Sequence, residues 1–475
     1  MAISKSKTKK YGTAKFLGVF TLAMINVSLI CNLRGLPIMA TYGLSIIFFL
    51  LIAVVFFLIP TAFISAELAS TFPGKGGIYH WVRQAFGERW AFVAISLQWL
   101  QNLFFFTTAL AAGSAVLAFL INPKLAQNPY FTIAVIIVFY WGSILINLRG
   151  MKASGRLANF GSTVGLIFPG IALLAIGLIW VFTDQSVAIP ISWQAAMPNL
   201  SNIGNFVFLG GLFLYFAGTE VSAVHVNEVK NPQKDYPKAI LISSVIIILV
   251  FLFGALAIAM IVPKDQISLT AGLMEAFYVV SKTFNISWLI PVVVLVMAPG
   301  MMVQVSSWIA GPSRGLFVAA QNGDLPRVFQ KMNKHDMPVN IMLVQGAIVT
   351  LISLLFVFSS TVSSGFWFFT AISAILYLFV YIIMFLTGIK LRKKFPDKPR
   401  PFSVPGGRKG MWFFAGLGIL ACAAGIPLST LPSSELTDIS LEKYIITITV
   451  LAIFFIALPF VIFALRKPSW KISGK

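Results

Sequence analysis

The chain alternates long apolar runs with short polar segments from one end to the other. Twelve of these runs have the length of about 20 residues that a helix needs to cross a bilayer. Backbone polar groups in lipid need internal partners, so helices are the only plausible spans, and the runs are too uniformly apolar for barrel strands. We expect spans near 16–40, 43–70, 90–121, 130–148, 157–183, 204–225, 238–262, 287–318, 339–359, 364–389, 411–431 and 443–465.

The composition supports a chain that is solvated by lipid. Of 475 residues, 58% are hydrophobic and only 10% are charged, whereas a soluble chain carries about a quarter charged residues. The net charge of +21 is spread over the short gaps between apolar runs. A nucleic-acid binder would gather basic residues on a polar domain, so we predict no nucleic-acid partner.

The distribution of basic residues predicts the orientation of the chain. If the first span follows a cytoplasmic N-terminus without cleavage and each span changes side, 30 of the 35 Lys and Arg residues fall on the cytoplasmic side. Positive residues favour the cytoplasmic side of short loops. We therefore expect a multi-pass protein of the cell inner (plasma) membrane with both termini in the cytoplasm. The densest basic stretch, 390–410, becomes a cytoplasmic loop that anchors the topology near anionic lipid.

Catalytic and metal chemistry have little support in the sequence. Cys31 and Cys422 lie in apolar runs without a disulfide framework, and His80, His225 and His335 show no metal spacing. No Ser–His pair, paired Asp or HExxH motif is evident. We predict no catalytic residue, no metal, no cofactor and no enzymatic activity, and no obligate protein partner is evident.

Two predicted spans contain sequences that should interrupt a helix. The first holds NLRGLP at 32–37 and the sixth holds YFAGTE at 215–220. Glycine and proline disfavour a straight helix, and each stretch also carries an ionisable residue at membrane depth, where such residues usually face a cavity. Interrupted helices at matching positions of two repeats indicate a transporter, with free N–H and C=O groups suited to a carboxylate and an ammonium. A simple kink with paired polar residues is the alternative.

Three ionisable residues in the spans are candidates for function. Arg34 and Glu220 could pair with each other in some states, and Arg34 could hold a substrate carboxylate in others. A permanent structural pair is the alternative. Glu67, near the cytoplasmic end of the second span, fits a structural pair with a nearby Lys or Arg better than a gating role.

Three stretches resemble a known family. IPTAFISAELASTFPGKGGIYHWVRQAFGERW is similar to the start of amino acid–polyamine–organocation (APC) transporters. FAGTEVSAVHVNEVKNPQKDYPKAI and SSWIAGPSRGLFVAAQNGDLPRVFQKMNKHDMPVN resemble the branch of bacterial glutamate/GABA antiporters and amino acid permeases. The resemblance covers nearly the whole chain. It implies an all-α membrane protein of about 12 transmembrane helices, a five-plus-five inverted repeat with broken helices one and six and two extra C-terminal helices.

The resemblance also implies the residues of a site. Candidates for coupling or gating are Glu220, Tyr377 and Tyr381, with ordinary packing as the alternative for the aromatic residues, and Glu67 is a further gating candidate from its position in the second span alone. The implied substrate-binding residues are Arg34, Gly35, Leu36, Phe216, Gly218, Gln304 and Trp308.

The chain departs from the glutamate/GABA antiporters in three places. NLRGLP replaces a stretch with tyrosines and an acid, Gln304 replaces an acid, and only about ten residues follow the last span. Both replacements make the cavity more positive, which favours an anionic or zwitterionic substrate. Acid gating by a long C-terminal plug is therefore not expected.

These observations predict a secondary active amino acid transporter, an antiporter working by alternating access. A proton-coupled symporter with Glu220 as proton carrier is the alternative, and a membrane-embedded enzyme or sensor is remote. The expected partners are amino acid substrates and the lipid bilayer. We expect one membrane domain over 1–475: tail 1–15, transport core 16–389, basic loop 390–410, two extra helices 411–465 and tail 466–475.

Overall fold

The computed structural model describes residues 18–74, 76–150, 163–222, 229–432 and 440–471. Every regular element within these ranges is helical. The predicted tail 1–15, the first residues of the fifth predicted span, the end of the sixth and His225 lie outside the described residues.

Nine helical stretches within the described ranges are long and apolar enough to cross a membrane. One of them, Gly43–Thr71, contains both α3 (Ile46–Ala53) and α4 (Ile59–Thr71). The others lie in α6 (Glu88–Ile121), α7 (Pro129–Leu148), α12 (Pro232–Ile261), α14 (Leu289–Gln321), α15 (Val339–Leu354), α16 (Val362–Lys394), α17 (Gly407–Ser429) and α18 (Leu441–Ala464).

The remaining predicted spans are the interrupted or shorter ones. The first is a pair of helices, α1 (Val19–Ile30) and Leu33–Ala40 with α2 (Leu36–Ala40), that meet at 41°. The fifth and sixth contain α9 (Phe168–Phe182) and the helix Ile203–Tyr215, whose last part is α11 (Phe208–Tyr215). All twelve predicted spans thus correspond to helical segments, and the all-α membrane fold is confirmed.

The break in the first span follows from its local sequence. Helix α1 ends at Ile30, and Cys31 takes an extended conformation with φ −65° and ψ 99°. The Asn32 side chain then accepts a hydrogen bond from the Arg34 N–H at 3.2 Å, which satisfies a donor that has no helical partner. Pro37 stands in the first turn of α2, where a missing N–H costs nothing. The chain therefore leaves one helix and starts another inside the protein.

The break in the sixth span centres on a glycine. Helix α11 ends at Tyr215, and Gly218 has a φ of +126°, which residues with a side chain rarely adopt. Its N–H donates to the Tyr381 hydroxyl of α16 at 2.7 Å. A side-chain hydroxyl from another span thus replaces the helical acceptor that this backbone group lacks.

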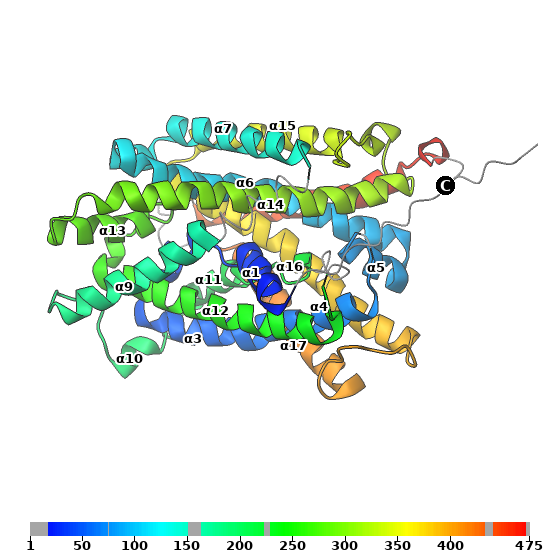
Figure 1. Ribbon diagram of the computed structural model, residues 1–475, viewed down its shortest axis with the longest axis horizontal. Helices are drawn as coiled ribbons and strands as arrows, with labels where there is room; N and C mark the ends of the chain where they lie inside the picture. Colours follow the sequence, from blue (N-terminus) through cyan, green and yellow to red (C-terminus); the bar gives the residue numbers. More distant parts are fainter. Residues whose placement is uncertain (1–17, 75, 151–162, 223–228, 433–439, 472–475) are drawn as a thin grey trace, which may run out of the picture.

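The helices are arranged around α6 and α16. Helices α6 and α14 run side by side through the middle of the molecule, with α7 and α15 on one side and α3, α12 and α17 on the other (Figure 1). The most apolar windows of α6 and α16 are 78% and 83% buried, whereas that of α18 is 17% buried. Helices α6 and α16 therefore form the centre of the protein, and α18 presents its apolar surface to lipid.

The two ends of the molecule differ in character. Helix α5 (Ile78–Phe86) lies at one end, and α10 (Trp193–Ala196) and α13 (Gly272–Thr283) lie at the other (Figure 1). Arg83, Arg392, Arg400 and Arg466 all make polar contacts at the α5 end. We call this end the basic face.

Candidate functional site

A small cavity lies where the two broken spans meet. Its walls come from the breaks after α1 and α11 and from α6, α14 and α16, and its free space is about that of one water molecule. A solute larger than water therefore needs a rearrangement of the walls to enter. The lining residues are Leu29, Ile30, Asn32, Arg34, Gln101, Phe105, Leu214, Tyr215, Ala217, Trp308 and Tyr377.

Arg34 is the charged residue in the cavity wall. Its side chain is buried, and Nη1 donates a hydrogen bond to the Thr108 hydroxyl. The guanidinium carbon lies 4.7 Å from the ring centre of Phe105 and 5.5 Å from that of Tyr215. Nε has no hydrogen-bond partner, and Arg34 forms no ion pair with the described part of the chain. A buried guanidinium without an anion favours a carboxylate in the cavity.

Glu220 has a separate set of partners behind the cavity. It accepts hydrogen bonds from Gln98 Nε2 at 3.0 Å and from the hydroxyls of Tyr377 and Tyr381. The expected Arg34–Glu220 ion pair is absent from this structure. The reason is that α6 and α16 supply neutral donors to Glu220, whereas Arg34 turns toward Thr108 on a different turn of α6.

The glycines of the two breaks allow aromatic rings to pack closely against the backbone. A Cβ atom added to Gly35 would lie 2.9–3.0 Å from the ring of Tyr215. A Cβ atom added to Gly218 would lie 3.2 Å from the Trp308 ring. Neither glycine lines the cavity, so both shape it through the aromatic residues that they permit to approach.

Two predicted binding residues lie away from the cavity. Leu36 is fully buried, and its side chain packs 3.0 Å from the position of a Cβ on Gly254 in α12. Phe216 is fully buried against Phe251, with ring centres 5.3 Å apart. Neither residue lines the cavity in this structure, because both side chains point to the apolar surface of α12, and their role in binding stays a prediction.

Two polar side chains of α14 stabilise the end of α1. Gln304 Nε2 donates to the carbonyl oxygens of Ser28 and Cys31, both at 3.2 Å. Trp308 Nε1 donates to the carbonyl of Leu29 at 3.0 Å. These carbonyls belong to the terminal turn of α1, whose acceptors have no helical donors. Trp308 also lines the cavity, whereas Gln304 does not.

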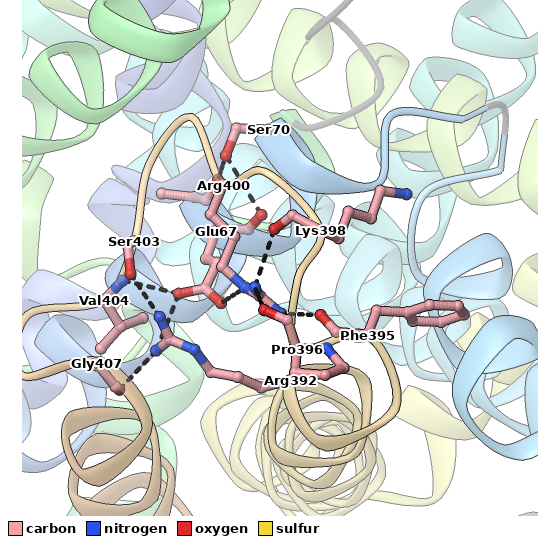
Figure 2. Close-up of polar contacts among 11 residues, drawn as sticks. Glu67, Ser70, Arg392, Phe395, Pro396, Lys398, Arg400, Ser403, Val404 and Gly407 are labelled. Carbon is pink, nitrogen blue, oxygen red and sulfur yellow. Dashed lines mark hydrogen bonds and ion pairs between the residues drawn. The ribbon is translucent and has the colours of Figure 1, made fainter.

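The predicted gating residues occupy two places. Tyr377 lines the cavity, and Tyr381 lies behind it, with 5.0 Å between the two ring centres. Glu67 is at the basic face, where it accepts hydrogen bonds from Arg400 Nε at 3.1 Å and the Val404 N–H at 2.7 Å (Figure 2). The structure therefore brings Tyr377 to the cavity wall with Tyr381 packed behind it, and it places Glu67 elsewhere.

Sequence reasoning missed the face of α6 that completes the site. Gln98 donates to Glu220, and Thr108 accepts from Arg34. Gln101 and Phe105 line the cavity, and the Phe105 ring also lies beside the Arg34 guanidinium. Their spacing of three, four and three residues places them on one side of a helix. Polar residues at this spacing in an apolar run were the available signal.

The fold and site define a membrane transporter. A model of the amino acid permease family matches residues 17–458. The chain belongs to this family, which is part of the APC superfamily, as the sequence predicted. In the part of the chain that the structure covers, no group of three or more His, Cys, Asp or Glu residues could hold a metal ion.

Several known proteins are similar over most of their length. An uncharacterized transporter of Legionella pneumophila is 39% identical over 89% of this chain and 91% of its own. A glutamate/gamma-aminobutyrate antiporter of Lactococcus lactis is 31% identical over 95% of this chain and 91% of its own. A probable agmatine/putrescine antiporter of the same species is 27% identical over 82% of each chain. The prediction of a multi-pass transporter for amino acids or related amines is confirmed.

Proposed function

We propose that this protein exchanges one amino acid for another across the membrane by alternating access. Arg34 carries the proposal: it is a buried cation that forms no ion pair with the residues that the structure describes, and it lies in the wall of a cavity between two broken helices. A substrate carboxylate would supply the missing anion and accept hydrogen bonds from the guanidinium. Antiporters among the relatives support exchange as the mode of transport.

The charge of the cavity favours an anionic or zwitterionic cargo. Glu220 accepts hydrogen bonds from neutral donors and does not line the cavity, whereas Arg34 forms part of its wall, so a bound molecule meets the cation rather than the carboxylate. Arg34 repels a molecule that carries only positive charges. The glutamate/gamma-aminobutyrate antiporter is therefore the better guide to the substrate than the agmatine/putrescine antiporter.

The basic face is the cytoplasmic side in this proposal. The segments that gather there carry most of the Lys and Arg residues, and such residues favour the cytoplasmic side of short loops. The protein would then be a single transport domain in a bacterial plasma membrane, with its core at 16–389. The basic loop 390–410 and both tails would lie on the cytoplasmic side.

Exchange is tested with purified protein in lipid vesicles. Vesicles are loaded with radiolabelled glutamate, and each of the twenty amino acids, GABA and polyamines is added outside. We expect acidic and zwitterionic amino acids to accelerate the exit of label and polyamines to have no effect. A uniform absence of acceleration would remove the amino acid assignment.

Proton-coupled symport is a second candidate because of Glu220. This carboxylate is buried in the membrane region and forms no ion pair with any described residue, an environment in which an acid can take up a proton. Uptake into empty vesicles that is driven by a proton gradient would favour symport. Uptake that requires an internal amino acid and ignores the gradient would favour exchange.

A further inference from the structure

Glu67 connects three segments at the basic face. Its carboxylate is only 3% exposed and lies near the end of α4. Arg400 Nε donates to Oε1 at 3.1 Å, and Arg392 Nη1 lies 3.4 Å from Oε2. The two guanidinium groups approach the carboxylate from α16 and from the loop 395–406 (Figure 2). Buried ion pairs add little net stability compared with apolar packing, whereas the loss of one partner is costly. Such a cluster serves best to hold segments in one specific arrangement.

The loop 395–406 is folded around the same two arginines. Arg400 holds the first half of the loop and Arg392 holds the second half. The Arg400 guanidinium donates to the carbonyls of Phe395, Pro396 and Lys398, and that of Arg392 donates to the carbonyl of Gly407 and the hydroxyl of Ser403. The conformation of the loop therefore depends on the arginines, and their positions depend on Glu67.

One continuous helix links this cluster to the cavity. Arg392, Tyr381 and Tyr377 all belong to α16, which runs without interruption from Val362 to Lys394. Arg392 lies about 16 Å from Tyr381 along the helix axis at 1.5 Å per residue. A displacement of the basic end of α16 therefore moves the tyrosines that hold Glu220 and Gly218.

The helices are in close contact beside the cluster. A Cβ atom on Gly388, one turn before Arg392, would lie 3.0 Å from Ile64 of α4 and 3.2 Å from Met411 of α17. The absence of a side chain at Gly388 lets α16 approach both neighbours. The three helices α4, α16 and α17 are thus tightly packed one turn from Arg392, so that α16 cannot shift there without its neighbours.

We propose that Glu67, Arg392 and Arg400 form an inner lock that ties α16 and the loop 395–406 to α4 and opens once in each transport cycle. Glu67 acts as a positioning residue, because it does not line the cavity. The proposal rests on the proposed function, because alternating access requires the cavity to open at the basic face. Its test measures access to the cavity and requires no amino acid, so the two can fail separately.

Access is measured with a cysteine at the cavity. Ala217→Cys places a thiol on a lining residue, in full-length protein whose Cys31 and Cys422 are replaced by Ala. A membrane-impermeant maleimide is added to lipid vesicles with the basic face outward and, separately, inward. Glu67→Gln is compared with Glu88→Gln, a matched control that removes an exposed carboxylate with two arginine partners, Arg83 and Arg466.

We expect Glu67→Gln to raise the labelling rate about tenfold from the basic face, since one charged contact can shift a two-state equilibrium by that factor. Labelling from the opposite face should not rise. Glu88→Gln should match the parent, and Glu67→Asp, which keeps the charge, should restore slow labelling. If Glu67 had a merely structural role, Glu67→Gln would lower thermal stability, and the labelling rate would not differ between the two faces.

The proposal is overturned if Glu67→Gln, correctly inserted, labels at the parental rate from the basic face. If this variant does not fold, Arg400→Gln is measured by the same criterion, because it retains the contact between Glu67 and Arg392. An equal rise from both faces would also overturn the lock.

Discussion

Arg34 and Glu220 lie at the two helix breaks of one cavity region and form no ion pair with each other. Arg34 donates to Thr108, and its guanidinium carbon lies over the rings of Phe105 and Tyr215. Glu220 instead accepts three hydrogen bonds from α6 and α16. The two charges are thus held independently, which leaves Arg34 available to a carboxylate that arrives with the cargo.

Arg34→Ala should abolish exchange while the protein still inserts. The variant removes the cation that a substrate carboxylate would meet, and a hydrogen bond to a charged group contributes about 1.5–3 kcal/mol, or roughly 10- to 150-fold in binding. Arg34→Lys keeps the charge and loses the planar fork, so it should retain weak exchange. The measurement is counterflow of radiolabelled glutamate. Normal exchange by Arg34→Ala would contradict the proposed binding role.

Gly35→Ala should impair exchange by displacing Tyr215. The added methyl group would stand 2.9–3.0 Å from the Tyr215 ring, and the Arg34 guanidinium carbon lies over this ring at 5.5 Å from its centre. Gly211→Ala is the matched control, because a Cβ there meets no atom within 4 Å. We expect a several-fold loss of exchange rate only for Gly35→Ala. Equal exchange rates for both variants would show that the close approach of Gly35 to the Tyr215 ring does not affect transport.

Tyr381→Phe should destabilise the break in the sixth span more than Tyr377→Phe does. The Tyr381 hydroxyl accepts from the Gly218 N–H at 2.7 Å and donates to Glu220. The Tyr377 hydroxyl also donates to Glu220, but among the described residues it accepts no hydrogen bond from the backbone of the break. Leaving a buried N–H without an acceptor costs about 1–3 kcal/mol. Thermal unfolding of both variants in detergent tests the order. A lower midpoint for Tyr377→Phe would contradict it.

Asp324 should make the stability of the basic face depend on pH. This residue follows α14 and is buried, which raises the pKa of its carboxyl to about 6 although Tyr79 donates to it at 3.0 Å. The pKa of this carboxyl in the unfolded chain is near 3.8, so the folded chain binds the proton of Asp324 more tightly than the unfolded chain does. The resulting stabilisation is complete below pH 4 and is lost as pH rises through 6, by at most about 3 kcal/mol.

Asp324→Asn should remove this pH dependence. The amide does not titrate, so the unfolding midpoint should vary less between pH 4 and 7 than in the parent. Asp265→Asn, at an exposed position between α12 and α13, is the control and should keep the parental profile. The measurement is thermal unfolding against pH in detergent. Parallel profiles for Asp324→Asn and the parent would contradict the prediction.

The sequence by itself determined the twelve spans and the positions of both breaks. Apolar length decides which segments can cross a bilayer. Pro37 and Gly218 disfavour continuous helix through local backbone geometry alone. Such properties depend on neighbours in the chain, so they can be deduced without knowledge of the fold.

Only the tertiary structure decided which side chains meet. Whether Leu36 or Tyr215 faces the cavity depends on how its helix is rotated, and successive residues differ by about 100° around a helix axis. The partners of Arg34, Glu220 and Glu67 lie on helices or loops distant in sequence. Their contacts arise from the packing of whole helices against one another, which no local pattern of residues specifies.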